Sequence, residues 1–275
     1  MTKTKKTLCR AAAVIITLAA VVFQRMSGPT HPLKAQFTLD GNIYNLSLPR
    51  SLDTDSEGMK LRIKGLPQDV QLCCIYEPLF SESPAWDTLN ARRNESGAFI
   101  ISFPPHHAAE KINYFITIAS SSESVFVTEH PVTLRFKDSV PAWLLIPHIL
   151  LMFAAMFFSN LAGILAFIKQ SSFYRYAKWA LWCLLGGGLV LGCLVQKMSF
   201  GQFWAGWPLG HDLTDNKTLV IVLLWAAAVW VNRKLKKRYI WAVLAAVIML
   251  AVYSIPHSTM GSVYNPKTGK VTTNF

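Results

Sequence analysis

Cysteine is scarce in this chain, and several motifs of common enzyme chemistry are absent. Five cysteines occur among 275 residues, and none are spaced as Cys-x-x-Cys, so the sequence indicates neither a disulfide framework nor a redox motif. No glycine-rich nucleotide-binding loop is present, and neither Ser258 nor Ser262 lies in a serine nucleophile pattern. Nucleotide-dependent enzymes and serine hydrolases are therefore not indicated.

Acidic residues are missing from three short basic segments beside apolar runs. The chain has 27 Lys and Arg against 15 Asp and Glu, a formal net charge of +12. An excess confined to loops between apolar runs is the positive-inside pattern of a membrane protein, whereas a nucleic-acid surface places its cations on a folded face. We therefore expect the lipid bilayer, and no nucleic acid, as a partner. The cations are Lys3, Lys5, Lys6, Arg10, Lys169, Arg175, Lys178, Arg233, Lys234, Lys236, Lys237 and Arg238.

Five apolar runs predict membrane-spanning helices, each of which needs about 20 residues with some tolerance at its ends. The first run has a basic start and a short apolar core, which also describes a signal peptide. No small-residue cleavage site follows directly at Val22, Phe23 and Gln24, so we favour a retained anchor. The runs are Ala11–Phe23, Ala142–Ile168, Trp179–Val195, Leu219–Val231 and Tyr239–Ile255.

The basic loops predict the orientation of these spans. They place the N-terminus, 169–178 and 232–238 in the cytoplasm, so the β-domain and the C-terminus lie outside. Eukaryotic targeting features are absent, which favours the inner (plasma) membrane of a bacterium. The expected divisions are a signal-anchor or signal peptide at 1–26, an exported β-sandwich at 27–140, a four-helix transmembrane bundle at 141–258, and an exported polar tail at 259–275.

The segment before the second span is rich in short runs of alternating polar and apolar residues, which predict β-strands. Turn residues such as Asp40-Gly41-Asn42 separate the runs. Seven or eight short strands in this length predict an all-β sandwich of the immunoglobulin type, although the Cys…Trp…Cys spacing of true immunoglobulin domains is absent. The runs are Ala35–Leu39, Ile43–Leu48, Met59–Lys64, Val70–Tyr76, Ala98–Phe103, Ile112–Ile118, Ser124–Thr128 and Pro131–Phe136.

This segment shows no catalytic constellation, so we expect it to bind a protein partner on the exported side. Cys73 and Cys74 are adjacent on a predicted strand, and one thiol is expected in the core and the other outside it. The histidines, including the pair His106 and His107, are expected to be solvated loop residues.

Small residues in the third span have two interpretations. Gly186, Gly187, Gly188 and Gly192 include a Gly-x-x-x-Gly step, which lets helix backbones approach closely. The alternative is that the glycines leave room for a flat cofactor such as haem.

Three histidines are predicted to share the exported membrane surface. His148 lies in the second span, His211 in the loop after the third, and His257 at the end of the fifth. Ionisable residues near membrane depth are functional candidates by default. Each also has a structural interpretation: His148 can bond a carbonyl that Pro147 leaves free, and His211 and His257 can belong to an interfacial aromatic belt.

Asp212 and Asp215 follow His211 and complete the candidate site. Asp215 or Thr214 can instead cap the fourth span. As a site, the three histidines and two carboxylates suit Zn or Cu, and His148 with His257 suits haem b.

Three functions follow from these features. The first is a metal or haem b protein, and the second is a membrane-embedded metal-dependent hydrolase with Asp212 or Asp215 as general base. In the third, the spans only anchor an exported binding domain. We favour a non-enzymatic accessory or assembly subunit, with the outward-facing histidine site as its sharpest additional hypothesis.

Overall fold

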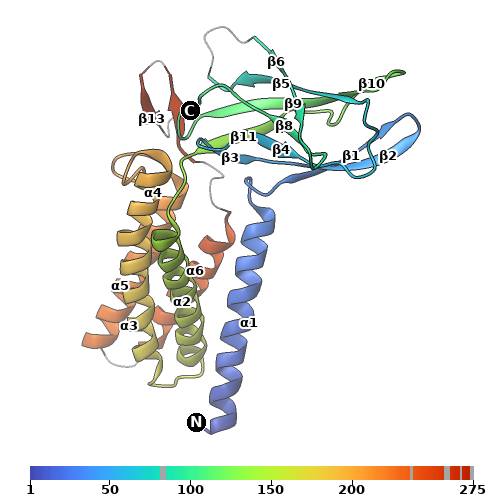
Figure 1. Ribbon diagram of the computed structural model, residues 1–275. Helices are drawn as coiled ribbons and strands as arrows, with labels where there is room; N and C mark the ends of the chain where they lie inside the picture. Colours follow the sequence, from blue (N-terminus) through green and yellow to red (C-terminus); the bar gives the residue numbers. More distant parts are fainter. Residues whose placement is uncertain (81–84, 236–237, 257–260, 267, 273–275) are drawn as a thin grey trace. The chain divides into compact units, whose positions relative to one another are not determined.

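The structure, a computed structural model, divides into two compact units (Figure 1). It describes residues 1–80, 85–235, 238–256, 261–266 and 268–272. The helical unit comprises residues 1–29 and 140–261, with 273–275, and the β unit comprises residues 30–139 and 262–272. The β unit is therefore built from two stretches of chain that lie on either side of most of the helical unit in the sequence.

The described part of the helical unit contains five helices, one of which has a π-helical middle. Its third helix runs continuously from Phe173 to Phe200, because α3, η1 and α4 follow one another without a break. The segments are α1 (Lys3–Ser27), α2 (Ala142–Phe167), α3 (Phe173–Cys183), η1 (Leu184–Leu191), α4 (Gly192–Phe200), α5 (Leu213–Lys234) and α6 (Tyr239–Ser254).

Four of these helices are long and apolar enough to cross a membrane: α1, α2, α5 and the continuous helix Phe173–Phe200. The apolar helix α6, at 16 residues, is shorter. Each of the five predicted apolar runs lies within one of these helices or overlaps nearly all of it. The length and composition of these helices therefore indicate a membrane protein.

Helix α1 packs on α2 through a polar contact inside the helical unit. The Nδ2 atom of buried Asn160 donates to Oγ1 of Thr17 at 3.0 Å, and that hydroxyl donates to the carbonyl oxygen of Ala13 at 2.7 Å. Ala13, Thr17 and Ala20 are the buried residues of α1 and recur at helical spacing. Small and hydroxyl side chains at that spacing let two membrane helices approach closely.

Among its described residues, the β unit contains thirteen short strands in four sheets. The largest has six strands in the order β3-β11-β9-β5-β6, with β10 also on β9, and the others are β4-β8-β7, β1-β2 and β12-β13. The strands are β1 (Leu33–Leu39), β2 (Asn42–Leu48), β3 (Ser51–Asp53), β4 (Met59–Leu61), β5 (Gln71–Pro78), β6 (Asp87–Asn90), β7 (Arg92–Arg93), β8 (Phe99–Ile101), β9 (Lys111–Ala119), β10 (Ser124–Phe126), β11 (Val132–Lys137), β12 (Val263–Asn265) and β13 (Lys270–Thr272).

The predicted fold, an all-β immunoglobulin-like sandwich followed by a separate transmembrane bundle, is wrong. The chain is a mixed α/β structure with about 45% helix and 23% strand. Its strands form several small sheets instead of two facing ones, and β3 pairs with β11 in parallel. Alternation identifies strands and their inner faces, but it does not determine which strands pair.

The last hairpin also contradicts a self-contained sandwich, because β12 and β13 follow α6 in sequence yet belong to the β unit. The N–H of Tyr264 donates to the carbonyl oxygen of Ala109 at 3.0 Å. Nη2 of buried Arg135 donates to the carbonyl oxygen of Ser262 at 3.0 Å. The segment expected as a polar tail thus contributes two strands.

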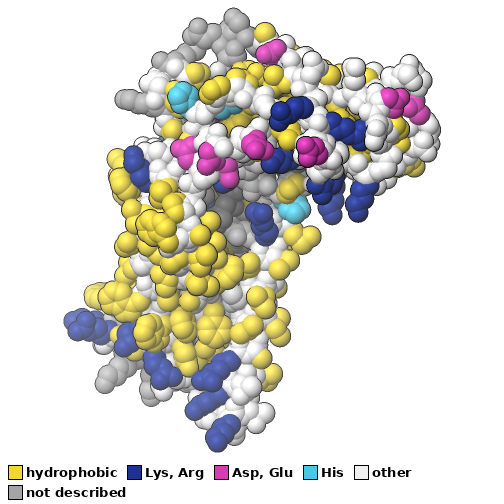
Figure 2. Space-filling model, in the orientation of Figure 1, with side chains coloured by type: hydrophobic (Ala, Val, Ile, Leu, Met, Phe, Trp, Pro, Cys, Tyr) yellow, Lys and Arg dark blue, Asp and Glu magenta, His cyan; other side chains and the backbone are white. Residues whose placement is uncertain are grey.

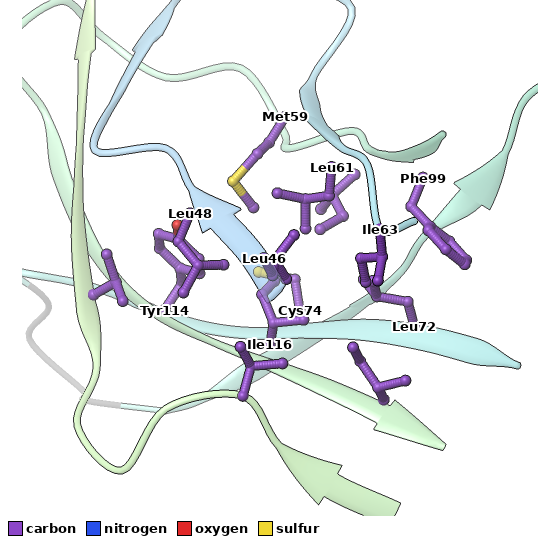
Figure 3. Close-up of a cluster of buried hydrophobic side chains, with 14 of the residues drawn as sticks. Leu46, Leu48, Met59, Leu61, Ile63, Leu72, Cys74, Phe99, Tyr114 and Ile116 are labelled. Atoms are coloured by element: carbon purple, nitrogen blue, oxygen red, sulfur yellow. The ribbon is translucent and has the colours of Figure 1, made fainter. Parts of the chain in front are cut away.

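One hydrophobic core joins the six-stranded sheet, the three-stranded sheet and the β1–β2 hairpin (Figure 3). Leu46 and Leu48 of β2, Met59 of β4 and Tyr114 of β9 all contribute buried side chains. The Tyr114 hydroxyl donates to the carbonyl oxygen of Pro49 at 2.8 Å, which gives the phenol a partner within this core. The β1–β2 hairpin is therefore attached to the rest of the unit through its inner face.

The adjacent cysteines of β5 point to opposite sides, as the alternation of a strand requires. Cys74 lies in the core, where burial raises the pKa of its thiol to about 12. Cys73 is half-buried, and its Sγ atom donates to Oδ1 of Asn90 at 3.1 Å. The prediction of one core thiol and one outer thiol is confirmed.

Candidate functional site

His148 lies on α2 and contacts η1. Its Nδ1 atom is 2.8 Å from the carbonyl oxygen of Gly187. A carbonyl oxygen only accepts hydrogen bonds, so Nδ1 carries the hydrogen and Nε2 is the acceptor of the neutral ring. The backbone N–H of Gly192 reaches the same carbonyl. The histidine thus bonds η1 rather than the carbonyl that Pro147 leaves free in α2.

The other two predicted histidines are not brought into a described cluster with His148. His211 is exposed in the segment between α4 and α5, and His257 lies outside the described residues. Within the described ranges, no group of three or more His, Cys, Asp or Glu side chains could hold a metal ion. A metal or haem b site at these histidines stays a prediction, which the metal content and visible spectrum of the purified protein test.

Asp212 is the N-cap of α5. Its Oδ1 atom accepts from the backbone N–H of Thr214 at 2.8 Å and of Asp215 at 3.4 Å. The sequence had offered Asp215 or Thr214 for this role, and the structure assigns it to the residue before them. A carboxylate at this position satisfies N–H groups that the first turn leaves without helical partners.

Asp215 ties the loop between α4 and α5 to the start of α5. Its Oδ2 atom accepts from Nε2 of Gln196 at 2.9 Å and from the backbone N–H groups of Ala205 at 2.6 Å and Gly206 at 3.1 Å. The carboxylate is buried, with 7% of the residue exposed. Gly206 lets the loop come this close, since a Cβ there would lie 2.6 Å from Cβ of Asp215.

Asn216 and Lys217 extend this network in two directions. Oδ1 of Asn216 accepts from the backbone N–H of Trp207 at 2.7 Å. Nζ of buried Lys217 donates to the carbonyl oxygens of Ile255 at 2.7 Å and Pro256 at 3.1 Å, just after α6. Asp215, which the sequence offered as a site residue, therefore belongs with Asn216 and Lys217 to a network that holds together a loop and two helix ends.

The glycines of η1 and α4 are used for close packing. A Cβ at Gly187 would lie 2.7 Å from Cβ of Leu151, and one at Gly188 would lie 2.9 Å from Cγ2 of Thr218. At Gly192 the nearest side chain is that of His148, 3.6 Å away. Protein side chains occupy the space beside these glycines, which supports the packing interpretation rather than a flat cofactor.

A groove lies on the β1–β2 hairpin of the β unit. Its volume is about 650 Å³, and it extends over five consecutive residues of β2, 43–47. The hairpin turns at Asp40 and Gly41, whose φ angles are +49° and +74°, the conformation that a tight two-residue hairpin turn requires. This tight turn brings polar side chains of the two strands together, because Gln36 pairs with Asn45 and Lys34 with Ser47.

The groove, called the basic groove below, has three cations and no carboxylate among its described lining residues. Lys34 comes from β1, and Arg62 and Lys64 come from the segment just after β4. All three side chains are exposed, and Figure 2 shows Lys and Arg gathered near the hairpin. The concentration is local, since residues 30–139 contain 13 acidic and 10 basic residues.

A second hollow lies beside β1, with a volume of about 450 Å³. It is bounded by Leu33–Gln36 of β1 and by residues 127–133, and it has both Arg50 and Glu129 in its lining. Lys34 lines this hollow as well as the basic groove. Among the described strands, β1 and β2 pair only with each other, so each has an outer edge with unpaired backbone groups.

Sequence reasoning missed the basic groove, although one clue was available. The run Lys60-Leu61-Arg62-Ile63-Lys64 places three cations on one face of an extended segment. The structure pairs Lys60 with Glu57 at 3.0 Å, which leaves Arg62 and Lys64 for the groove. The alternation indicated a polar outer face, but the hairpin opposite that face depends on tertiary packing.

His106 was expected to be a solvated loop residue, and this expectation is wrong. Its side chain is 6% exposed and stacks on Phe136 with ring centroids 4.0 Å apart. Nδ1 lies 3.0 Å from Oε1 of Glu110, whose Oε2 accepts from the backbone N–H of His107 at 2.9 Å. Burial acts to raise the pKa of Glu110, but the hydrogen bonds from His106 and His107 outweigh it and lower that pKa below 4.5.

This lowered pKa predicts an acid-sensitive contribution to stability. The ionised Glu110 stabilises the folded state above its ordinary pKa of 4.5, and this contribution is lost as pH falls through the lower folded pKa. Glu110→Gln should therefore be less stable than wild type at about pH 7, with the difference shrinking towards about pH 3. Thermal unfolding at several pH values measures it, and an equal difference at all pH values contradicts it. The control is Glu95→Gln, which removes an exposed carboxylate and so measures how much the loss of one negative charge alone changes stability.

No protein-family model, curated protein or solved structure matches this chain. The residues and geometry of the chain itself are therefore the basis for its function.

Proposed function

We propose that this chain is a membrane-anchored, non-enzymatic binding protein whose β unit holds an acidic segment of a partner protein in the basic groove. The observation that supports it most directly is the presence of Lys34, Arg62 and Lys64, with no carboxylate among the lining residues that the structure describes, along a groove of about 650 Å³. Carboxylates are attracted by such a surface, and complementary charge steers a partner to it.

The shape of the groove favours a polypeptide over a small anion. Five consecutive strand residues, 43–47, extend over roughly 17 Å, which suits an extended peptide. The outer edges of β1 and β2 offer backbone donors and acceptors to an added strand, a common mode of peptide recognition. Exposed Ile43, 65% accessible, adds apolar surface at the groove. The partner is thus best described as an extended acidic segment with some apolar side chains.

The proposed location is the bacterial inner membrane, with the N-terminus in the cytoplasm and the β unit outside. Four span-length helices support the membrane, and the positive-inside distribution of Lys and Arg supports this orientation. An accessory or assembly subunit fits the arrangement, because such a protein holds a partner at the membrane without performing chemistry on it.

A labelled acidic peptide of about ten residues tests the groove with the full-length protein in detergent. Arg62→Gln/Lys64→Gln should weaken binding about tenfold, since each surface charge pair contributes about 0.5–1 kcal/mol. Lys60→Gln/Arg92→Gln removes the same charge from nearby positions outside the groove and should leave binding nearly unchanged. Fluorescence anisotropy at several salt concentrations measures both. Equal binding by the two double variants contradicts the groove as the site.

The same peptide tests the orientation separately. It should bind cells stripped of their outer membrane, which expose the outer face, and should not bind inside-out vesicles. The reverse result would overturn the proposed orientation while leaving the groove intact.

A further inference from the structure

A small hollow opens between α3 and α5 in the helical unit, at the end where the basic loops lie. Its volume is about 320 Å³. Four of its lining residues come from α3 and two from α5. They are Tyr174, Lys178, Leu181, Trp182, Val229 and Arg233.

The lining of this hollow changes from charged to apolar along the helices. Lys178 lies in the second turn of α3, and Arg233 is the penultimate residue of α5, so both cations lie near helix ends. Trp182 on α3 and Val229 on α5 lie one turn further into the apolar helices. Trp182 is 66% exposed, as a side chain facing lipid can be. The hollow therefore has a cationic rim and an apolar wall, which match the two parts of a lipid.

The two cations have no acidic neighbours in the adjoining sequence. Residues 168–178 and 232–238 contain no Asp or Glu. Across the described residues, neither Lys178 nor Arg233 has a carboxylate within ion-pair distance, and Nζ of Lys178 instead lies 5.3 Å from the ring centroid of Tyr174. Figure 2 shows Lys and Arg side chains gathered at one end of the helical unit. The charge at this rim is thus available to an external anion.

We propose that this hollow is a binding site for an anionic phospholipid. The phosphate lies between Lys178 and Arg233, and an acyl chain follows Leu181, Trp182 and Val229 into the membrane. Basic pockets between transmembrane helices recognise anionic head groups through this combination of charge and apolar surface. The guanidinium of Arg233 suits phosphate oxygens because it can donate two parallel hydrogen bonds. The site is independent of the basic groove, since it lies in the other unit.

The test uses the full-length protein, stripped of lipid in detergent and then titrated with phosphatidylglycerol or phosphatidylcholine. Wild type should retain phosphatidylglycerol preferentially, measured as lipid bound to the intact protein by mass spectrometry. Each cation near an anionic lipid contributes a factor of roughly five in affinity, so Lys178→Gln/Arg233→Gln should weaken retention about thirtyfold. Both side chains are exposed, so the variant should unfold at the wild-type temperature when no lipid is added.

The control variant is Arg175→Gln/Lys234→Gln, which removes two cations from the same helix ends but not from the hollow. It should retain phosphatidylglycerol almost as well as wild type. Equal losses in the two variants would overturn the proposal in favour of a general effect of surface charge. Glycerol phosphate, which has the head group without acyl chains, should not displace the lipid. If glycerol phosphate displaced the lipid at a concentration similar to that of phosphatidylglycerol, the site would be one for free phosphate, and the proposal would be overturned.

Discussion

Replacing Asp215 by alanine should destabilise the helical unit by about 3 kcal/mol or more. The substitution removes the acceptor of three hydrogen bonds, from Gln196 and from the backbone N–H groups of Ala205 and Gly206. Each buried donor left without a partner costs about 1–3 kcal/mol, partly recovered if water enters. For a protein of this size, a loss of about 3 kcal/mol corresponds to a fall in Tm of roughly 6–12 °C. Thermal unfolding in detergent, followed by tryptophan fluorescence, measures the change.

Asp212→Asn provides the matched comparison at the same helix end. Asparagine caps helices about as well as aspartate, so the acceptor for Thr214 is kept and the expected change is a few tenths of a kcal/mol. If the Asp215 variant unfolds at the same temperature as this control, the three donors find other partners and Asp215 does not hold the loop. The comparison also bears on the predicted hydrolase. A general base can be replaced without a large loss of stability, so a large loss in the Asp215 variant favours a structural role for this carboxylate.

Gly187→Ala should destabilise the packing of η1 on α2 by about 1–3 kcal/mol. A single added methyl group would lie 2.7 Å from Cβ of Leu151 and 3.2 Å from Sδ of Met152. The neighbouring backbone of Leu151, 3.4 Å away, limits how far α2 can yield without moving. The hydrogen bond from His148 to the Gly187 carbonyl lies at the same contact and should weaken with it. The expected fall in Tm is about 2–12 °C.

Gly186→Ala is the control for this prediction, since it adds the same methyl group one residue earlier. There the nearest atom is Cδ1 of Leu151 at 3.6 Å, an ordinary contact. Alanine also favours helical conformations over glycine by about 1 kcal/mol, so this variant should be as stable as wild type or slightly more so. Similar losses at both positions would show that the backbone freedom of η1, and not its close contact with α2, makes glycine necessary.

Features that depend on one stretch of chain were predictable from the sequence. The apolar run Ala142–Ile168 became α2, because length and apolarity alone decide whether a helix suits a membrane. Each of the eight alternating runs overlaps one strand, for example Ile112–Ile118, which lies within β9. The short strands β3, β6, β7, β12 and β13 were missed, because two to four residues are too few to show a period.

Features that depend on distant residues were not predictable. The parallel pairing of β3 with β11 joins Leu52 to Phe136, and no local pattern specifies such a pair. The polar residues near α5 were recognised as a group, but the sequence could not show that Asp215 would bond Gln196 and a loop backbone. The sequence singled out the three histidines because histidine can bind metals. The cations of the basic groove are two lysines and an arginine, and the sequence alone does not show which residues lie beside them.

The hairpin β12–β13 imposes an order on the biosynthesis of this protein. Arg135 bonds a carbonyl 127 residues further along the chain, so the ribosome must finish the intervening helices before that contact can form. In the same way, the ring of His107 can stack on Tyr264, at a centroid distance of 4.3 Å, only after Tyr264 has been synthesised. The β unit therefore remains incomplete during most of translation, and its final strands are made only after α6. The β unit can thus be completed only after every helix of the helical unit has been synthesised.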